Sequence, residues 1–294
     1  MASIDLSGVG VALVTPFKND KSIDYPALAN LIDYQIENGV DYLVVLGTTS
    51  ENPTLSNAER QEVASFIVDK VTGRVPLVIG CGGNDTHSIV EQLKTADFSS
   101  YCAILSVVPF YNKPSQEGIY RHYEAIAKAS PVPVVLYNVP GRTGVNMTAQ
   151  TTLRLAADFP NIVAIKEASG NMEQVDEIIR HKRPDFQVIS GDDAITFPLI
   201  TLGAVGVISV IGNAFPREFS RMARLALAGQ YDEARKIHHT FTDLFRLLFV
   251  DGNPAGVKCV LHAMGMIENE LRLPLVPTRL TTDEQIRQFL QTLS

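Results

Sequence analysis

Lys166 is the residue of this sequence best suited to chemistry, because it stands late in the apolar run 162–169. An ammonium ion among small and β-branched side chains is poorly solvated, which favours the free amine, and such amines form Schiff bases with carbonyl substrates. Side chains alternate along a strand, so Lys166 shares a face with Ala164 and Ala168, while Glu167 points the other way and is not its ion-pair partner. By itself, this segment is more typical of a surface lysine at a strand end, since lysines with altered chemistry are rare.

Hydroxyl, phenol and guanidinium groups follow three other β-rich runs. Thr48 and Thr49, in a Gly-Thr-Thr-Ser-Glu motif, are suited to binding a carboxylate or passing a proton, although a helix N-cap is the alternative. Tyr111 and Tyr137 would move protons around a carbinolamine, although tyrosines at strand ends more often serve packing. Arg142 offers a fixed fork for a substrate carboxylate, with a loop salt bridge as the alternative.

Two later runs offer bare backbone to a small ligand, at Gly191 and around Ile208. The neighbouring pair Asp192 and Asp193 favours helix N-capping over a metal site or an acid dyad. No metal site is expected, because all histidines fall on predicted helices without ligand spacing: His87, His122, His181, His238, His239 and His262. The three cysteines lack a Cys-x-x-Cys spacing and are expected to be buried and unpaired: Cys81, Cys102 and Cys259.

The elements that must position these residues alternate regularly. Segments of helical periodicity separate eight β-rich runs: 9–14, 42–46, 77–81, 102–108, 132–137, 162–166, 186–189 and 205–210. Helix starts are marked by Ser56 and Asn171 as capping boxes, by Asp85, and by Ser115. Near-continuously apolar strands that alternate with helices predict an α/β fold with a parallel sheet, and eight units without a glycine-rich phosphate loop favour a (β/α)8 TIM barrel.

The barrel is expected to span residues 1–229, because the alternation stops there. Residues 230–250, 254–266 and 282–293 have helical patterns, so residues 230–294 are expected to form a small C-terminal helical appendage. Active sites of TIM barrels lie at the C-terminal ends of the strands, where all the candidate residues above fall. Because the candidate residues share this position, we favour a reactive amine over a surface lysine for Lys166.

Composition limits the partners. The 294 residues include 25 basic and 32 acidic side chains, a net charge of −7, which argues against binding to nucleic acid or to an anionic membrane. No apolar run is long enough to span a membrane, and the first residues do not resemble a signal peptide. We therefore expect a cytoplasmic protein that binds small molecules.

Several motifs resemble one family, the pyruvate-dependent class I aldolases of the N-acetylneuraminate lyase and dihydrodipicolinate synthase group. They are the Gly-Thr-Thr-Ser-Glu loop, the Pro-Phe-Tyr-Asn-Lys-Pro segment at 109–114, the Tyr-Asn-Val-Pro-Gly-Arg-Thr-Gly segment at 137–144, and Lys166. The resemblance runs from about Gly8 to the stretch at 271–275. Arg142 favours the dihydrodipicolinate synthase branch, since the sialic acid lyases lack it, while Ser50 is a minor departure.

The resemblance implies that Lys166 forms a Schiff base with pyruvate, whose enamine attacks L-aspartate 4-semialdehyde. It implies that Tyr137 donates and accepts protons, in a relay with Thr48 and with Tyr111 of a neighbouring subunit. It also implies ligand contacts for four residues: Thr49 and the backbone of Ile208 with pyruvate, Arg142 with the semialdehyde carboxylate, and the Gly191 carbonyl with the second substrate. No cofactor is implied, and the expected assembly is a homotetramer built as a dimer of dimers.

Three other interpretations remain open at this stage. A sister aldolase or dehydratase would use the same Schiff base on a keto-deoxy sugar acid or a hydroxyproline-derived acid, although Arg142 argues against it. A non-catalytic metabolite-binding barrel would have no use for a buried amine beside two phenols. A flavin or nucleotide enzyme would need a phosphate site after the last two strands, where residues 211–214 offer one glycine.

Overall fold

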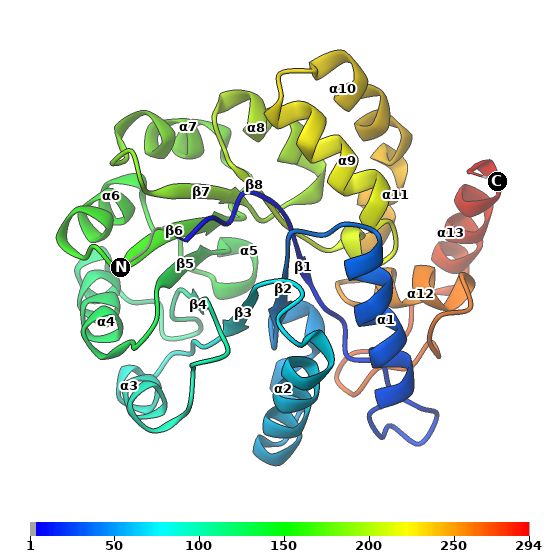
Figure 1. Cartoon of the computed structure of the whole chain (residues 1–294), viewed down its shortest axis with the longest axis horizontal. Coiled ribbons are helices and arrows are strands. Elements are labelled where there is room, and N and C mark those ends of the chain that lie inside the picture. The colour runs from blue at the N-terminus through cyan, green and yellow to red at the C-terminus, as the bar shows by residue number, and fades with distance from the viewer. Residues whose placement is uncertain (1–3, 294) are drawn as a thin grey trace.

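A closed barrel of eight parallel strands forms the centre of the molecule, as a computed structural model that describes residues 4–293 shows (Figure 1). The strands follow one another around the barrel in sequence order, and β8 pairs with β1 to close it. They are β1 (Gly8–Ala12), β2 (Tyr42–Val45), β3 (Leu77–Gly80), β4 (Ala103–Val107), β5 (Val134–Asn138), β6 (Ile162–Glu167), β7 (Gln187–Ser190) and β8 (Gly206–Ser209). The predicted (β/α)8 barrel is therefore confirmed, and each strand lies within two residues of its predicted bounds.

Closure brings β8 very near β1. At Gly206 an added Cβ would lie 2.0 Å from the carbonyl oxygen of Gly8, so only glycine fits this position without a shift of the backbone.

Helices cover the outside of the barrel (Figure 1). Those of the barrel are α1 (Tyr25–Glu37), α2 (Asn57–Val71), α3 (Thr86–Thr95), α4 (Gln116–Ala129), α5 (Pro140–Thr143), α6 (Ala149–Asp158), α7 (Met172–His181), α8 (Thr196–Leu202) and α9 (Pro216–Leu227). The caps predicted at Ser56, Asp85 and Ser115 are confirmed, and Ser56 forms a complete capping box with Glu59. The second predicted box is wrong in part: Asn171 caps α7, but the side chain of its partner Gln174 donates to buried acceptors instead of returning to the cap.

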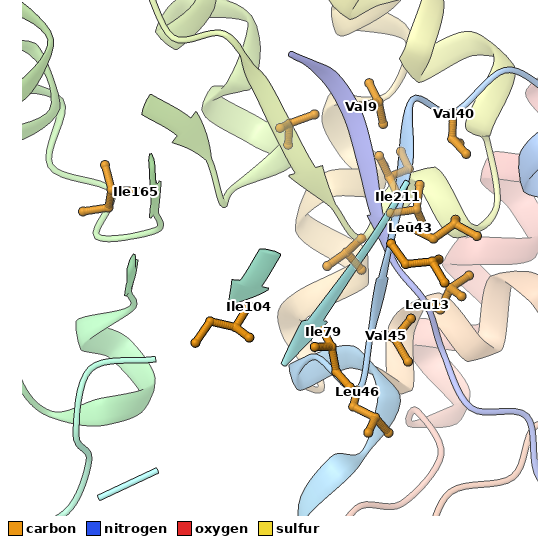
Figure 2. Packing of buried hydrophobic residues seen from close by; sticks show 14 of the residues in the cluster. Val9, Leu13, Val40, Leu43, Val45, Leu46, Ile79, Ile104, Ile165 and Ile211 are labelled. Atoms are coloured by element: carbon orange, nitrogen blue, oxygen red, sulfur yellow. The ribbon is translucent and has the colours of Figure 1, made fainter. Parts of the chain in front are cut away.

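Side-chain alternation along the strands builds two apolar layers. On β2, Tyr42 and Val44 point into the barrel, whereas Leu43 and Val45 point outward to the helices. Figure 2 shows part of this outer layer, in which Leu43 and Val45 lie near Leu13 and Ile211. Because both faces of each strand are buried, the strands are apolar almost throughout, which is the signal that made them predictable.

Four helices follow the barrel: α10 (Tyr231–Thr240), α11 (Thr242–Val250), α12 (Ala255–Ala263) and α13 (Leu280–Thr292). In Figure 1 they appear in yellow to red at one side of the barrel. The single helix predicted at 230–250 is wrong, because Phe241 separates α10 from α11. Its ring is buried against Phe215, with ring centroids 4.9 Å apart, and this packing fixes the break. The domain boundary at residue 229 stays a prediction.

The described residues contain no helix of the length and apolar character that a membrane span requires.

A fully buried ion pair joins the barrel to the C-terminal helices. The Nζ of Lys258 on α12 lies 2.5 Å from Oε1 of Glu51, which follows β2, and neither side chain is exposed. Lys258 also donates to the carbonyl of Glu270 and lies 4.2 Å from the ring centroid of Phe17, while Glu51 accepts from the backbone amide of Arg272. Burial lowers the pKa of Lys258, although Glu51 opposes this shift.

Replacement of Lys258 by methionine should strongly destabilise the fold, because Glu51 would keep a buried charge without its cation. Loss of one partner of a buried pair typically costs about 3–5 kcal/mol. Urea denaturation of Lys258→Met measures this loss, with Lys258→Met/Glu51→Gln as the matched control, which should lose less because no unpaired charge remains. A loss below about 1 kcal/mol, the usual cost at an exposed pair, would contradict the expectation.

Candidate active site

A cavity of about 230 Å³ opens at the C-terminal ends of the barrel strands. Its walls combine polar groups from the strand ends with side chains of the C-terminal helices. The lining residues are Thr48, Thr49, Tyr137, Val139, Arg142, Lys166, Ala168, Gly191, Asp192, Val210, Phe249 and Asn253. Six of the eight residues predicted for the site therefore line one cavity, and the exceptions are Tyr111 and Ile208.

Lys166 and Tyr137 face each other across neighbouring strands. They are register partners on β6 and β5, and the Lys166 Nζ lies 4.4 Å from the centroid of the Tyr137 ring. Both are buried, with Lys166 only 5% exposed. Beside them Gly191 makes room, since an added Cβ there would lie 3.0 Å from the Lys166 Cε and 2.7 Å from the Cβ of Ala168. The amine thus faces the tyrosine ring in a buried part of the cavity.

A bulge in β6 aims Lys166 into the barrel. The pairing with β5 shifts by one residue, so that Val134 pairs with Ile162 but Val135 pairs with Ala164. Ile162 and Ile165 belong to the outer layer, whereas Val163 and Ala164 both pack toward the barrel interior. If side chains alternated strictly from Ile162, Lys166 would point outward to the helices. Val163, which has no partner on β5, is the extra residue that turns Lys166 to the barrel interior instead.

The two threonines belong to a short 3₁₀ helix, η1 (Thr48–Ser50). Thr49 is 2% exposed, and its hydroxyl accepts a hydrogen bond of 3.1 Å from the Asn253 amide. The Ser50 hydroxyl donates to the carbonyl of Gly47 and so supports the turn. The N-cap alternative for Thr48 and Thr49 is wrong, because Gly47 occupies the cap of η1 and Ser56 caps α2.

Arg142 lies on the single-turn helix α5 and reaches the cavity with an exposed side chain. Its guanidinium donates to the backbone carbonyl of Asn253 at 3.3 Å. No carboxylate of residues 4–293 lies within ion-pair distance, so the loop salt bridge considered from the sequence is wrong. The guanidinium keeps most of its donors available to an anion.

Tyr111 and Ile208 take other positions. Tyr111 has a positive φ of 71° and is 89% exposed, in the loop between β4 and α4. Ile208 on β8 is buried inside the barrel, and Val210, two residues later, reaches the cavity. A second cavity of about 540 Å³ adjoins the first, shares Arg142 and Asn253 with it, and is bordered by Phe110, next to Tyr111.

Sequence reasoning missed the contribution of the C-terminal helices, because nothing in their pattern relates them to the strand ends. Asn253 is 6% exposed and bridges the site, with its side chain on Thr49 and its carbonyl on Arg142. Phe249 adds an apolar wall.

Asp192 and Asp193 have different roles. Asp192 caps a short 3₁₀ helix, as predicted, and also lines the cavity. The prediction is wrong for Asp193, which is fully buried and accepts hydrogen bonds from the backbone amides of Val210 and Ile211 at 3.0 and 2.8 Å. Burial raises the pKa of Asp193 to about 6. Asp193 thereby fixes the loop after β8 at the edge of the cavity.

Known proteins share this fold and sequence. The chain matches the family described as "Dihydrodipicolinate synthetase family" over residues 5–293. A 4-hydroxy-tetrahydrodipicolinate synthase of Parabacteroides distasonis is 68% identical over 294 residues, which is 100% of this chain and 99% of the relative. The crystal structure of dihydrodipicolinate synthase from Aquifex aeolicus is 42% identical with a TM-score of 0.94, over 98% of both chains. A chloride-inhibited dihydrodipicolinate synthase from Acinetobacter baumannii, complexed with pyruvate, is 40% identical with a TM-score of 0.94, over 98% of both chains.

Replacement of Asp193 by asparagine should change how stability depends on pH. A carboxyl whose pKa is raised from 3.8 to about 6 on folding stabilises most below pH 4, and stability falls as pH rises through 6. The difference corresponds to about 3 kcal/mol. Asparagine keeps an oxygen for both amides but does not titrate, so Asp193→Asn should gain stability relative to the unmodified protein between pH 4 and pH 7. Urea denaturation across this range tests it, and a difference independent of pH would contradict it.

Proposed function

This chain belongs to the dihydrodipicolinate synthetase family, and we propose that it condenses pyruvate with L-aspartate 4-semialdehyde through a Schiff base on Lys166. The product is 4-hydroxy-tetrahydrodipicolinate, at the first committed step of diaminopimelate and lysine biosynthesis. The single observation that carries the proposal is the buried Lys166 amine, 4.4 Å from the Tyr137 ring, in a cavity that also holds Arg142. The chain is accordingly a lyase, as its relatives are.

The first half of the reaction uses the wall formed by Lys166 and Tyr137. The Lys166 amine attacks the ketone carbon of pyruvate, water leaves, and an iminium forms. Loss of a proton from the pyruvate methyl group gives the enamine. We assign the transfer of these protons to the Tyr137 phenol and Thr48, a role supported by their position in the lining of the same cavity. Thr49 and the backbone of Ile208 hold the pyruvate carboxylate.

The second half adds Arg142 and Gly191, which line the same cavity. The enamine carbon attacks the aldehyde carbon of the semialdehyde, whose carboxylate binds the Arg142 guanidinium, while the Gly191 carbonyl contacts the same substrate. The amino group of the semialdehyde then attacks the iminium carbon and releases the Lys166 amine. This ring closure regenerates the enzyme, and the iminium nitrogen supplied by Lys166 accepts the electron pair when the methyl proton is lost, so the scheme uses no cofactor.

Tyr111 belongs to the proposal through a second subunit. A phenol that is 89% exposed, in a loop beside the larger cavity, is suited to enter the site of a neighbouring copy rather than its own. It would complete the proton relay of Thr48 and Tyr137 there. We accordingly include a homotetramer, built as a dimer of dimers, and a cytoplasmic location in the proposal.

Borohydride reduction in the presence of pyruvate should attach the substrate to Lys166. Peptide mass mapping identifies the modified residue, and Lys258 provides an internal control, because it is equally buried but lies behind Glu51 with no exposed surface. Lys166→Arg should abolish the adduct, since a guanidinium stays protonated and is not a nucleophile. An adduct on another lysine, or none in active protein, would overturn the mechanism.

Replacement of Arg142 by alanine should impair use of the semialdehyde and spare pyruvate. Loss of a charge-assisted hydrogen bond costs about 1.5–3 kcal/mol, which corresponds to a fall of about 10- to 100-fold in kcat/KM for the semialdehyde. A coupled assay with each substrate varied in turn measures this, with pyruvate trapping as the control. If trapping fell by the same factor, Arg142 would be a pyruvate ligand instead.

A further inference from the structure

Glu167 is a buried carboxylate beside the reacting lysine that the reaction scheme does not use. It ends β6, one residue after Lys166 and on the opposite face of the strand, and it is 1% exposed. Within residues 4–293, no lysine, arginine or histidine lies within ion-pair distance of it. Burial of a carboxylate without a cation destabilises the fold unless hydrogen bonds compensate. The partners in those hydrogen bonds therefore indicate the role of Glu167.

The Glu167 carboxylate acts only as a hydrogen-bond acceptor. The donors are the backbone amide of Ser169 at 2.7 Å, the Gln174 side-chain amide at 3.0 Å and the Asn138 side-chain amide at 3.1 Å. The side chain of Asn138 is held in one orientation, because its oxygen accepts from the backbone amide of Met147 at 3.0 Å. Its nitrogen carries two hydrogens, which are shared between Oδ1 of Asn146 at 2.8 Å and the Glu167 carboxylate, so position 167 faces a donor from Asn138.

The pair Asn138 and Glu167 occupies the register step next to the reacting pair. Tyr137 pairs with Lys166, and Asn138 pairs with Glu167, on the same two strands. The other end of this strand pair carries the bulge, where the register shifts by one residue. A shift of the strand pairing by one residue would turn each side chain to the other face of the sheet. A bulged pair such as β5 and β6 therefore needs an interaction at the strand ends that selects one pairing.

We propose that Asn138 and Glu167 form a positioning pair, which locks the register of β5 against β6 so that the Lys166 amine meets the Tyr137 phenol. The inference rests on the proposed function, since it assigns these two side chains to the same reaction. Within residues 4–293, no hydrogen bond joins Lys166 to Tyr137, and their mutual contact is the approach of the amine to the ring. The buried carboxylate serves as the acceptor across the strand pair for the second hydrogen of the fixed Asn138 amide, while Asn146 accepts the first.

A double-mutant cycle across the strand pair tests this. Asn138→Asp sets two carboxylates against each other, and Glu167→Gln sets an amide donor against the donors around it. Each single variant should lower kcat by about 10- to 100-fold, the usual effect of a small misplacement of reacting groups, with KM for pyruvate changed less than about 3-fold. Asn138→Asp/Glu167→Gln again sets a donor against an acceptor between the two strands, so its kcat should exceed that of either single variant. It should stay below that of the unmodified protein, because the carboxylate at position 138 also faces the amide oxygen of Asn146.

The matched control is Asn161→Ala, at the residue that immediately precedes β6, at the end away from Glu167. Asn161 donates to the carbonyl of Ala127 at 2.7 Å, so this variant should lower the thermal midpoint and leave kcat within about 2-fold. If a single variant does not accumulate as folded protein, Asn138→Ser takes its place with the same expectation, because Glu167 keeps its bonds to Gln174 and Ser169.

Three results would overturn the positioning role: single variants with kcat within about 2-fold of the unmodified protein, a double variant whose loss is the product of the two single losses, or an equal fall of kcat in Asn161→Ala. Pyruvate trapping separates these from a failure of the proposed function. Absence of trapping in the unmodified protein would remove the Schiff base itself, whereas normal trapping there with unchanged rates in the variants would remove only the role of Asn138 and Glu167.

Discussion

Closure of eight parallel strands is the constraint on which the site depends. Parallel strands that close on themselves must end on the same rim, so residues far apart in sequence, such as Thr48, Lys166 and Gly191, line one cavity. Closure also leaves no free strand edge, and the ladder continues from β8 to β1 through the glycine contact at Gly206. The last residues of the strands carry the amine and the phenol, and the loops that follow the strands supply further walls of the cavity.

Four ionisable groups buried near this rim offset the cost of desolvation in three different ways. Lys258 and Glu51 neutralise each other and join the loop after β2 to the C-terminal helices. Glu167 has no cation and is surrounded by amide donors, and Asp193 has two backbone donors and a raised pKa. In each case the buried group holds a segment next to the cavity, so these polar contacts determine where the reacting groups lie.

The strands and most of the rim were predictable from the sequence, because apolar β-rich runs and the residues directly after them carry their own local signal. The face on which Lys166 lies was predictable only when side-chain alternation was counted from Ala164 and Ala168. Counted from Ile162, the same rule gives the wrong face, since the bulge at Val163 leaves no pattern in the sequence. The contact between Asn253 and Thr49 joins residues 204 positions apart, and it depends on how the C-terminal helices dock rather than on any motif. The burial of Lys258 was missed for the same reason.

The bridge formed by Asn253 gives the site an order of assembly. A ribosome delivers the chain from the N-terminus, so the strands and the reacting lysine emerge before Asn253, Lys258 and Arg272. Until those residues have left the exit tunnel, Glu51 lacks its ion-pair partner Lys258, and Arg142 lacks the carbonyl of Asn253 to which it donates. A barrel without these residues therefore holds its amine in an incomplete pocket, because Phe249 and Asn253 supply walls of the cavity.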